Sequence, residues 1–253
     1  MHNILLMTAT ITPPAGVPNL ARTDPAQRLQ DYLEALDFYL SLLDHGVDAI
    51  VVGENSGSDL SALRELVVRR GHGLRVEFIS FQGLDHSPNR GRGYGEFKLV
   101  DHLMAVSTTV EKHRSTAIVW KVTGRYIVRN LGKILAQQNS DQVDLYCNLR
   151  DRPSPWADMY LLAWSSRGHD EFLYGIYKDF DEETLGSAPE VKFRELVDRA
   201  RVDSSLRIVP RFRVVPYVVG LRGGDGRPYT RGRGTVKYWA RVAASKVARN
   251  LWI

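Results

Sequence analysis

The sequence predicts an α/β fold, in which a mostly parallel sheet is flanked by helices and followed by a C-terminal amphipathic helix. Short runs of apolar residues, such as 3–10 and 48–53, lack the polar alternation of half-exposed strands, which is typical of strands buried on both faces. Segments with leucines at helical spacing separate these runs. Polar and glycine-rich motifs follow the runs directly, at the strand ends where such sheets bind ligands.

The first half of the chain alternates strand and helix. Strands are expected at 3–10, 48–53 and 75–80, with a fourth that ends at Lys121. Helices are expected at 26–43, 60–70 and 96–112. Asp24 and Pro25 are the predicted cap and first residue of the first helix. A polar loop rich in glycine is expected before the third helix, up to Gly95.

The second half is less regular. A strand is expected at 144–148, a segment rich in aromatic residues at 157–164, a helix at 191–200 and a late strand at 211–220. The sequence contains no internal repeat and no visible domain boundary. We therefore expect one domain over 1–234 and a separate basic helix over 235–253.

The composition is that of a globular protein. The 253 residues are 43% hydrophobic and 25% charged, and the net charge is +5. The basic residues are spread along the chain among 29 acidic ones, which argues against a dedicated nucleic-acid binder. The one cysteine, Cys147, excludes an intramolecular disulfide. The first residues are expected to form neither a signal peptide nor a membrane span.

Several familiar catalytic motifs are absent from the sequence. The segment GRGYGE has the pattern G-x-G-x-G rather than the dinucleotide-binding G-x-G-x-x-G, and it does not open directly from a strand. There is no GxxxxGK[ST] loop, no G-x-S-x-G elbow and no HExxH pair. Neither a dinucleotide oxidoreductase nor a P-loop enzyme is expected.

The motifs TATI, IVVGENSGSD, GYGE and TGRY, in this order, resemble the nucleotide-binding half of the GT-A glycosyltransferases, whose fold is Rossmann-like. The segment IVVGENSGSD is similar to the IVVDDGSxD segment of the family that contains many bacterial polysaccharide synthases. The likeness covers about residues 3–130. It implies a nucleotide-sugar-binding half at 1–130, an acceptor half at 131–234, and a role in making a cell-surface glycan such as a capsule or O-antigen.

The sequence departs from that family at the end of the fourth strand. The family usually has D-x-D there, which holds a divalent metal against the diphosphate, whereas this chain has KVTGRY. Fixed cations can also stabilise a diphosphate leaving group. We therefore expect no metal and no other cofactor, with Lys121 and Arg125 binding the diphosphate. The alternative is that both residues form ordinary ion pairs at a strand end.

The resemblance implies further donor-binding residues at the strand ends and in the loops after them. They are Thr8, Thr10, Arg22, Glu54, Asn55, Ser56, Gly95, Thr123 and Gly124. The segment 54–56 could instead be a tight turn that caps the next helix. The loop around Arg22 could serve only as a helix entry, and the glycines before Glu96 could be a hinge.

An inverting transfer needs a carboxylate that accepts the proton of the acceptor. Asp158 is the first candidate, because it follows a turn in the acceptor half, and Glu96 is the second. Trp156 and Tyr160 could stack on an acceptor sugar. Asp158 could also be a simple capping residue.

The segment 235–253 predicts a basic amphipathic helix. Apolar residues from Val236 to Leu251 fall on one side, and Lys237, Arg241 and Arg249 point mostly away from it. The helix could lie on an anionic membrane or pack on the protein's own sheet.

The expected partners are a nucleotide-sugar donor, a glycan or lipid-linked glycan acceptor and an anionic membrane surface, with no nucleic acid. The expected location is cytoplasmic, with peripheral attachment to the inner face of the cytoplasmic membrane. The alternatives are a sugar nucleotidyltransferase and a non-catalytic protein that binds the membrane surface.

Overall fold

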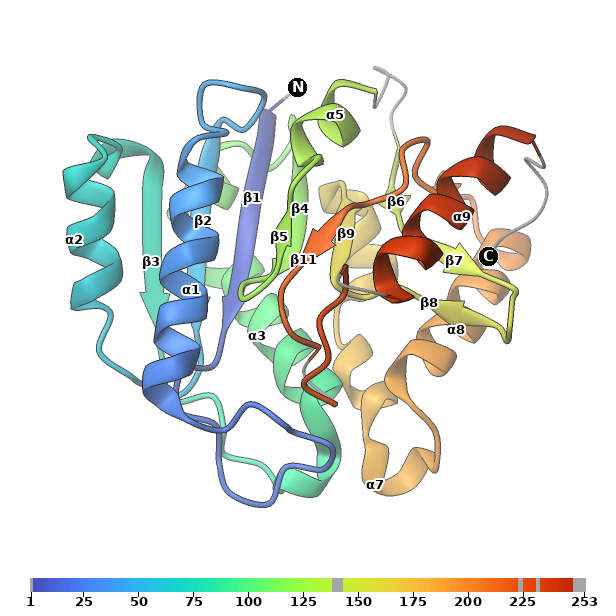
Figure 1. The fold of residues 1–253 in the computed structure, drawn as a ribbon, viewed down its shortest axis with the longest axis horizontal. Helices are drawn as coiled ribbons and strands as arrows, with labels where there is room; N and C mark the ends of the chain where they lie inside the picture. Colours follow the sequence, from blue (N-terminus) through green and yellow to red (C-terminus); the bar gives the residue numbers. More distant parts are fainter. Residues whose placement is uncertain (1, 138–142, 223–224, 231–232, 248–253) are drawn as a thin grey trace.

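The fold is described here from a computed structural model, which covers residues 2–137, 143–222, 225–230 and 233–247 (Figure 1). Its central sheet has the order β10-β6-β9-β4-β1-β2-β3. The strands are β1 (His2–Ala9), β2 (Ala49–Glu54), β3 (Val76–Ser80), β4 (Ala117–Thr123), β6 (Leu145–Tyr146), β9 (Leu161–Trp164) and β10 (Ile208–Val209). The pairs are parallel except those of β9, which runs antiparallel to β4 and β6.

Two short ribbons lie outside this sheet. In one, β5 (Ile127–Val128) pairs with β11 (Val218–Val219), and in the other β7 (Leu149–Arg150) pairs with β8 (Trp156–Ala157). The helices are α1 (Pro25–Leu40), α2 (Ser61–Arg69), α3 (Gly91–Val106), α4 (Thr108–Lys112), α5 (Leu131–Ala136), α6 (Ser166–Gly168), α7 (Glu182–Leu185), α8 (Pro189–Asp203) and α9 (Arg233–Val247). Short helical turns occur at Gly73–Arg75, Pro88–Arg90, His169–Leu173 and Ile176–Phe180.

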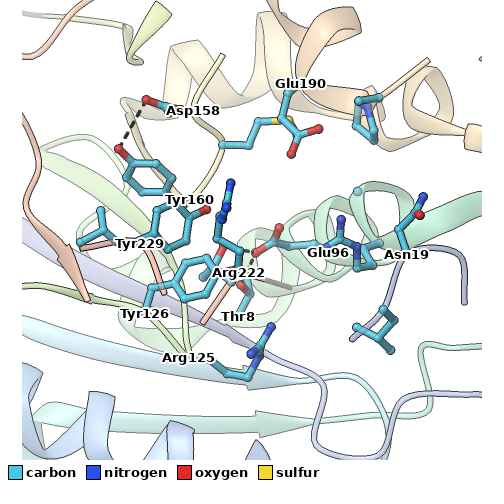
Figure 2. Close-up of a pocket in the computed structure, with 18 of the residues that line it drawn as sticks. Thr8, Asn19, Glu96, Arg125, Tyr126, Asp158, Tyr160, Glu190, Arg222 and Tyr229 are labelled. Atoms are coloured by element: carbon cyan, nitrogen blue, oxygen red, sulfur yellow. Dashed lines mark hydrogen bonds between the residues drawn. The ribbon is translucent and has the colours of Figure 1, made fainter. Parts of the chain in front are cut away.

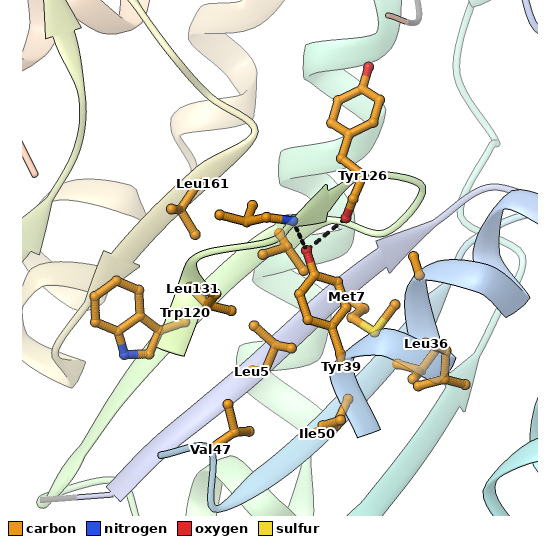
Figure 3. Packing of buried hydrophobic residues seen from close by; sticks show 14 of the residues in the cluster. Leu5, Met7, Leu36, Tyr39, Val47, Ile50, Trp120, Tyr126, Leu131 and Leu161 are labelled. Carbon is orange, nitrogen blue, oxygen red and sulfur yellow. Dashed lines mark hydrogen bonds between the residues drawn. The ribbon is translucent and has the colours of Figure 1, made fainter. Parts of the chain in front are cut away.

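Both faces of the sheet are buried, as the unbroken apolar runs predict. Along β1, Leu5 and Met7 join the cluster that packs under α1 and α2, while Ile4 and Leu6 join the cluster under α3 and α8. Figure 3 shows the first cluster, in which the Tyr39 hydroxyl donates to a backbone carbonyl after β4 and accepts from a backbone amide of β5. The predicted α/β class with a mostly parallel sheet, flanking helices and a C-terminal helix is confirmed.

Two predicted elements were wrong. The glycine-rich segment that ends at Gly95 is the beginning of α3 rather than a loop. Gly93 allows this part of the helix to pack against Pro189, because a Cβ at position 93 would lie only 2.8 Å from the Pro189 side chain. The late strand expected at 211–220 is reduced to Val218–Val219. Pro216 lies inside the predicted strand, and proline has no N–H to donate to a ladder.

The sheet has a topological switch point between β1 and β4. From β1 the chain moves outward to β2 and then β3, and it returns across β1 to form β4 on the other side. Ligands of α/β sheets bind in the crevice that such a reversal leaves at the carboxyl ends of the strands. Gly124 follows β4 in this crevice and donates its N–H to the carbonyl of Thr8 over 2.9 Å.

Among the described residues, no helix combines the length and apolar character that crossing a bilayer requires.

Candidate active site

A cavity of about 1000 Å³ opens at the carboxyl ends of β1 and β4. Residues from both halves of the chain line it, and Figure 2 shows that Glu96 and Glu190 approach it from opposite sides. Ten of the residues that the sequence singled out line its wall. They are Thr8, Thr10, Asn55, Gly95, Glu96, Thr123, Arg125, Trp156, Asp158 and Tyr160.

Glu96, in the second turn of α3, forms the floor. Its Oε1 lies 2.7 Å from the Nζ of Lys121 and accepts hydrogen bonds from Thr8 Oγ1 at 2.6 Å and Thr123 Oγ1 at 2.9 Å. Burial alone would raise the pKa of Glu96, but the Lys121 ammonium and the two hydroxyls outweigh it and hold this pKa below its usual value. Glu96 is therefore an ionised carboxylate neutralised by its partner.

Lys121 lies beneath the floor and does not line the cavity. Its side chain is fully buried, and its Nζ also donates to the Met159 carbonyl at 2.8 Å and to Thr123 Oγ1 at 3.2 Å. Burial lowers the pKa of Lys121, and Glu96 opposes this. With these three partners, the ammonium is directed at the protein rather than at a ligand.

Arg125 lies on the wall next to α1. Only 8% of it is exposed, and its Nη1 makes no hydrogen bond within the described residues. The nearest carboxylate oxygen, Oδ2 of Asp31, is 3.6 Å from this nitrogen. This contact is an ion pair but is too long for a hydrogen bond, so an anion at this position would give the Nη1 donor a hydrogen bond that it now lacks. Arg125 is thus a candidate anion-binding group of the cavity.

The α1 side of the cavity also contains residues that the sequence analysis missed. Arg28 is buried, donates from Nε to the Thr10 carbonyl at 2.6 Å and from Nη2 to the Tyr32 hydroxyl at 3.2 Å. The Tyr32 hydroxyl in turn accepts from the Thr10 N–H at 2.9 Å. Arg28 and Tyr32 are four residues apart, so they share one face of α1, and both side chains reach the end of β1. This i, i+4 spacing is the sequence pattern from which the pair could have been predicted.

Asn55 is held in place at the end of β2. Its Oδ1 accepts from Thr10 Oγ1 at 2.6 Å, and its Nδ2 donates to the Gly95 carbonyl at 3.3 Å. These contacts join β1, β2 and α3 at the cavity wall. Asn55 therefore fixes the relative position of three elements that line the cavity.

Glu54, Ser56, Arg22 and Gly124 do not line the cavity. Glu54 is fully buried and accepts from the backbone N–H groups of Ile11, Ser56 and Ser58, so it organises the turn after β2. The segment does not cap the next helix, as the alternative interpretation expected, because the N-cap of α2 is Leu60 and no side chain caps it. Arg22 pairs with Asp31 at 2.7 Å. A Cβ on Gly124 would lie 2.6 Å from the Thr8 carbonyl oxygen, so this glycine allows the ends of β1 and β4 to approach closely.

The second half of the chain supplies the opposite wall. Asp158 is 5% exposed and accepts from Arg150 Nη2 at 2.6 Å, Asn148 Nδ2 at 2.8 Å and, more weakly, the Tyr160 hydroxyl at 3.4 Å. Both of its oxygens therefore have partners within the protein. The Arg150 guanidinium lies 5.8 Å from the Trp156 ring centroid.

Three tyrosines form an aromatic surface beside Asp158, as Figure 2 shows. The ring centroids of Tyr126 and Tyr229 are 5.1 Å apart, and those of Tyr160 and Tyr229 are 5.7 Å apart. Burial and the neighbouring Asp158 carboxylate raise the pKa of Tyr160 well above its usual value, so its phenol stays protonated. Only Tyr160 was predicted, because Tyr126 and Tyr229 come together from segments far apart in the sequence.

Glu190 faces the floor from the first turn of α8. Burial raises its pKa and outweighs the lowering by a backbone hydrogen bond and by the Arg92 guanidinium, while the negative charges of Glu182 and Glu96 add to the rise. No ion pair reaches its carboxylate from the described residues. Glu190 could not be found from the sequence because it lies on a helix far along the chain from the strand-end motifs.

The cavity carries an excess of positive charge. Among the described residues, eight arginine and lysine side chains line it against five carboxylates. The cations are Arg28, Arg92, Arg125, Arg150, Arg222, Arg227, Lys237 and Arg241, and the carboxylates are Glu96, Asp158, Glu182, Glu190 and Asp225. This balance favours an anionic ligand.

The residues at the end of β4 do not fit a divalent metal. Carboxylates are the usual ligands of Mg²⁺ and Mn²⁺, but here the carboxylate of Glu96 is already paired with the fully buried ammonium of Lys121. In the described part of the chain, no group of three or more His, Cys, Asp or Glu side chains is arranged to hold a metal ion.

No protein-family model and no curated protein matches the sequence. Among solved structures, the chain is similar to a protein described as a nucleotide-diphospho-sugar transferase from Desulfovibrio desulfuricans G20, with TM-score 0.45 and 13% identity over 97% of this chain and 98% of that one. It is also similar to the galactosyltransferase LgtC, with TM-score 0.47 and 10% identity over 76% of this chain and 70% of that one. For a cytidylyltransferase from Leptospira borgpetersenii the TM-score is 0.43 and the identity 12%, over 83% and 76%. At these values the likenesses carry no argument about function.

Proposed function

We propose that the protein transfers a sugar from a nucleoside-diphosphate donor to a hydroxyl group of a glycan or lipid-linked glycan. The observation that carries the proposal is Arg125, a buried guanidinium whose Nη1 has no hydrogen-bond partner in the described residues, at the switch point of a parallel sheet. Guanidinium groups bind phosphate oxygens with two parallel donors, and nucleotides bind α/β sheets at this crevice.

The cavity also suits the size and the leaving group of such a donor. Its volume of about 1000 Å³ lies at the upper end of ordinary ligand pockets. Breaking the bond between the sugar carbon and the diphosphate oxygen leaves an additional negative charge on the diphosphate. Arg125, which lies on the α1 side of the cavity, would stabilise that charge without a metal.

In the transfer, the acceptor oxygen forms a bond to the anomeric carbon and loses its proton to a carboxylate. Asp158 and Glu96 are the candidates from the sequence. Their oxygens are engaged by Arg150 and by Lys121, whereas Glu190 faces the cavity with a raised pKa. A general base is most effective when its pKa lies near the working pH, so we give this role to Glu190. Asp158 then positions Arg150, and Glu96 positions Thr8 and Thr123.

The acceptor would lie on the side formed by the second half of the chain. Trp156 and the surface made by Tyr126, Tyr160 and Tyr229 provide aromatic area on which a sugar ring can rest. The donor would then occupy the α1 side, next to Arg125. Apart from Tyr126, this division follows the expected nucleotide-binding half at 1–130 and acceptor half at 131–234.

A thermal-shift panel tests the proposal. Each of the sugar conjugates of UDP, GDP, CDP and CMP is added with magnesium, with manganese or with chelator. At least one nucleoside-diphosphate sugar should raise the unfolding temperature, because a ligand that binds only the folded state stabilises it. The shift and the turnover should persist in chelator. Loss of both in chelator, restored by manganese, would contradict a metal-independent site.

Nucleoside triphosphates and sugar phosphates, added to the panel, separate the main alternative. A sugar nucleotidyltransferase would bind a nucleoside triphosphate and a sugar phosphate, and it would release pyrophosphate instead of a nucleoside diphosphate. Chromatography of the products distinguishes these two outcomes. If no nucleotide raises the unfolding temperature of the protein, both enzymatic hypotheses are refuted.

A further inference from the structure

In the C-terminal helix α9, basic side chains face the active-site cavity and apolar side chains face outward, which is the reverse of an ordinary surface helix. Lys237 and Arg241 line the active-site cavity. Val236 and Trp239 face outward and are 70% and 61% exposed, and the nearby Ala240 and Ala243 are exposed as well. A surface helix normally buries its apolar side. The outward apolar side of α9 therefore requires a different explanation.

A second groove of about 750 Å³ runs beside Trp239, between α9 and the segment 129–136 that includes α5. The described residues that line it are aromatic, aliphatic, basic or neutral, and none is a carboxylate. They are Leu42, His45, Arg129, Asn130, Gly132, Lys133, Ala136, Tyr217, Tyr238 and Trp239. The groove thus combines apolar walls with positive charge.

Arg129 and Lys133 supply the positive charge. Both are exposed, and neither takes part in an ion pair with a described residue. Asp44, which precedes the groove residue His45 in the sequence, is already paired with Arg75 at 2.8 Å. Two cations at an open groove with no facing carboxylate are complementary to an anionic surface.

Hydrogen bonds and ring contacts hold the groove in shape. Asn130 accepts from the Tyr217 N–H at 2.8 Å and donates to the Val215 carbonyl at 2.9 Å. The rings of Tyr217 and Tyr238 meet edge to face with centroids 4.8 Å apart, and Tyr238 also lines the active-site cavity. One helix therefore forms a wall of both cavities.

We propose that this groove, together with the outward face of α9, docks the protein onto an anionic lipid membrane. Lipid phosphates would contact Arg129 and Lys133, while Trp239 and Val236 would enter the interface between headgroups and acyl chains, where tryptophan is favoured. The active-site cavity, on the other side of α9, would then lie next to the membrane surface. The docking does not depend on the proposed sugar transfer, because it needs no substrate.

Co-sedimentation of the full chain with phosphatidylcholine vesicles, with and without phosphatidylglycerol, tests the docking. We expect binding only when phosphatidylglycerol is present. The double variant Arg129→Glu/Lys133→Glu should lower the partition coefficient by more than about tenfold, since each basic residue near an anionic surface contributes about fivefold. Trp239→Ala should also lower it. The matched control Lys112→Glu/Arg199→Glu makes the same charge change on other exposed surfaces and should bind as the parent does.

Three results would overturn the docking. One is equal binding to both kinds of vesicle, and another is equal loss in the charge control and in the groove variant. The third is release of the protein by excess soluble glycerol phosphate, which would indicate a small-molecule anion site. Gel filtration without lipid supplies a further check, because a dimer that Trp239→Ala dissociates would mean that a second copy covers this face. Unchanged unfolding midpoints of the variants would establish that their binding defects are not folding defects.

Discussion

At the residue scale, the Nη1 donor of Arg125, which makes no hydrogen bond to a described residue, leads to a direct prediction. Arg125→Ala should weaken binding of a nucleoside diphosphate by about ten- to a hundredfold, because a hydrogen bond to a charged group contributes about 1.5–3 kcal/mol. Isothermal titration with the nucleotide found in the thermal-shift panel measures this. Arg69→Ala, which removes an arginine that is largely exposed on α2, is the control. Unchanged affinity in Arg125→Ala would remove Arg125 from the site.

The carboxylates of the cavity can be separated by their pH profiles. Glu190 acts as a base only when deprotonated, and burial raises its pKa, so turnover should fall with decreasing pH earlier than an exposed glutamate would allow. Glu190→Gln should abolish transfer with little change in donor affinity. Glu195→Gln, on the exposed part of the same helix, should leave the profile unchanged.

Asp158→Asn provides the complementary measurement. Its two oxygens hold Arg150 and Asn148, so we expect a weaker acceptor interaction, seen as a raised KM, with measurable turnover remaining. Complete loss of turnover in Asp158→Asn, with activity retained in Glu190→Gln, would return the base role to Asp158, the candidate from the sequence.

At the scale of elements, the ion pair between Lys121 on β4 and Glu96 on α3 joins the sheet to the helix that carries the cavity floor. Lys121→Met leaves Glu96 without its counter-charge and should lower the free energy of unfolding by about 3–5 kcal/mol. The double variant with Glu96→Gln should recover part of this loss. Urea unfolding measures both. A stable Lys121→Met protein with weakened nucleotide binding would instead support the diphosphate role expected from the sequence.

Gly124 sets how closely β4 and β1 approach at the crevice. In Gly124→Ala the new Cβ would meet the Thr8 carbonyl oxygen at 2.6 Å, so the strand ends must move apart and stability should fall by about 1–3 kcal/mol. Gly73→Ala is the matched control, because no atom lies within 4 Å of a Cβ at that position. Equal unfolding midpoints for the two variants would show that the strand ends adapt without cost.

The elements that could be predicted are those whose formation depends on residues close together in the sequence. The continuous apolar runs indicated β1 to β4 to within a few residues, and Asp24 caps α1 as expected, accepting from the Gln27 N–H at 3.0 Å. The start of α3 was missed because glycine has low helix propensity, and the packing of Gly93 against Pro189 overrides that propensity.

The candidate site was only partly predictable for a related reason. Residues adjacent to strand ends, such as Thr8, Asn55 and Arg125, could be found from the sequence because their position follows from the sheet. Glu190, Tyr229 and Lys237 reach the same cavity from elements of the second half, and their approach depends on long-range packing that a single sequence does not specify. The direction of the Lys121 side chain could not be predicted either, since its partner Glu96 comes from a helix.

At the scale of the whole molecule, the two halves share one sheet. Strand β9 pairs with β4 from Val119 to Val122, and Trp120 of β4 stacks on Tyr146 and Phe212 of the second half, with centroids 5.8 and 6.2 Å apart. Without the second half, β4 would become an exposed edge and Trp120 would face water. An exposed apolar edge strand favours aggregation.

We therefore predict that residues 1–137 do not fold independently, although they contain the expected nucleotide-binding half. This fragment should lack a cooperative urea transition and elute as aggregates in gel filtration. A chain of residues 1–232, which lacks α9 and retains all seven described strands of the central sheet, is the control and should unfold cooperatively. If residues 1–137 unfold cooperatively and bind the nucleotide, the two halves are separate folding units, and the shared sheet contributes less stability than its buried contacts imply.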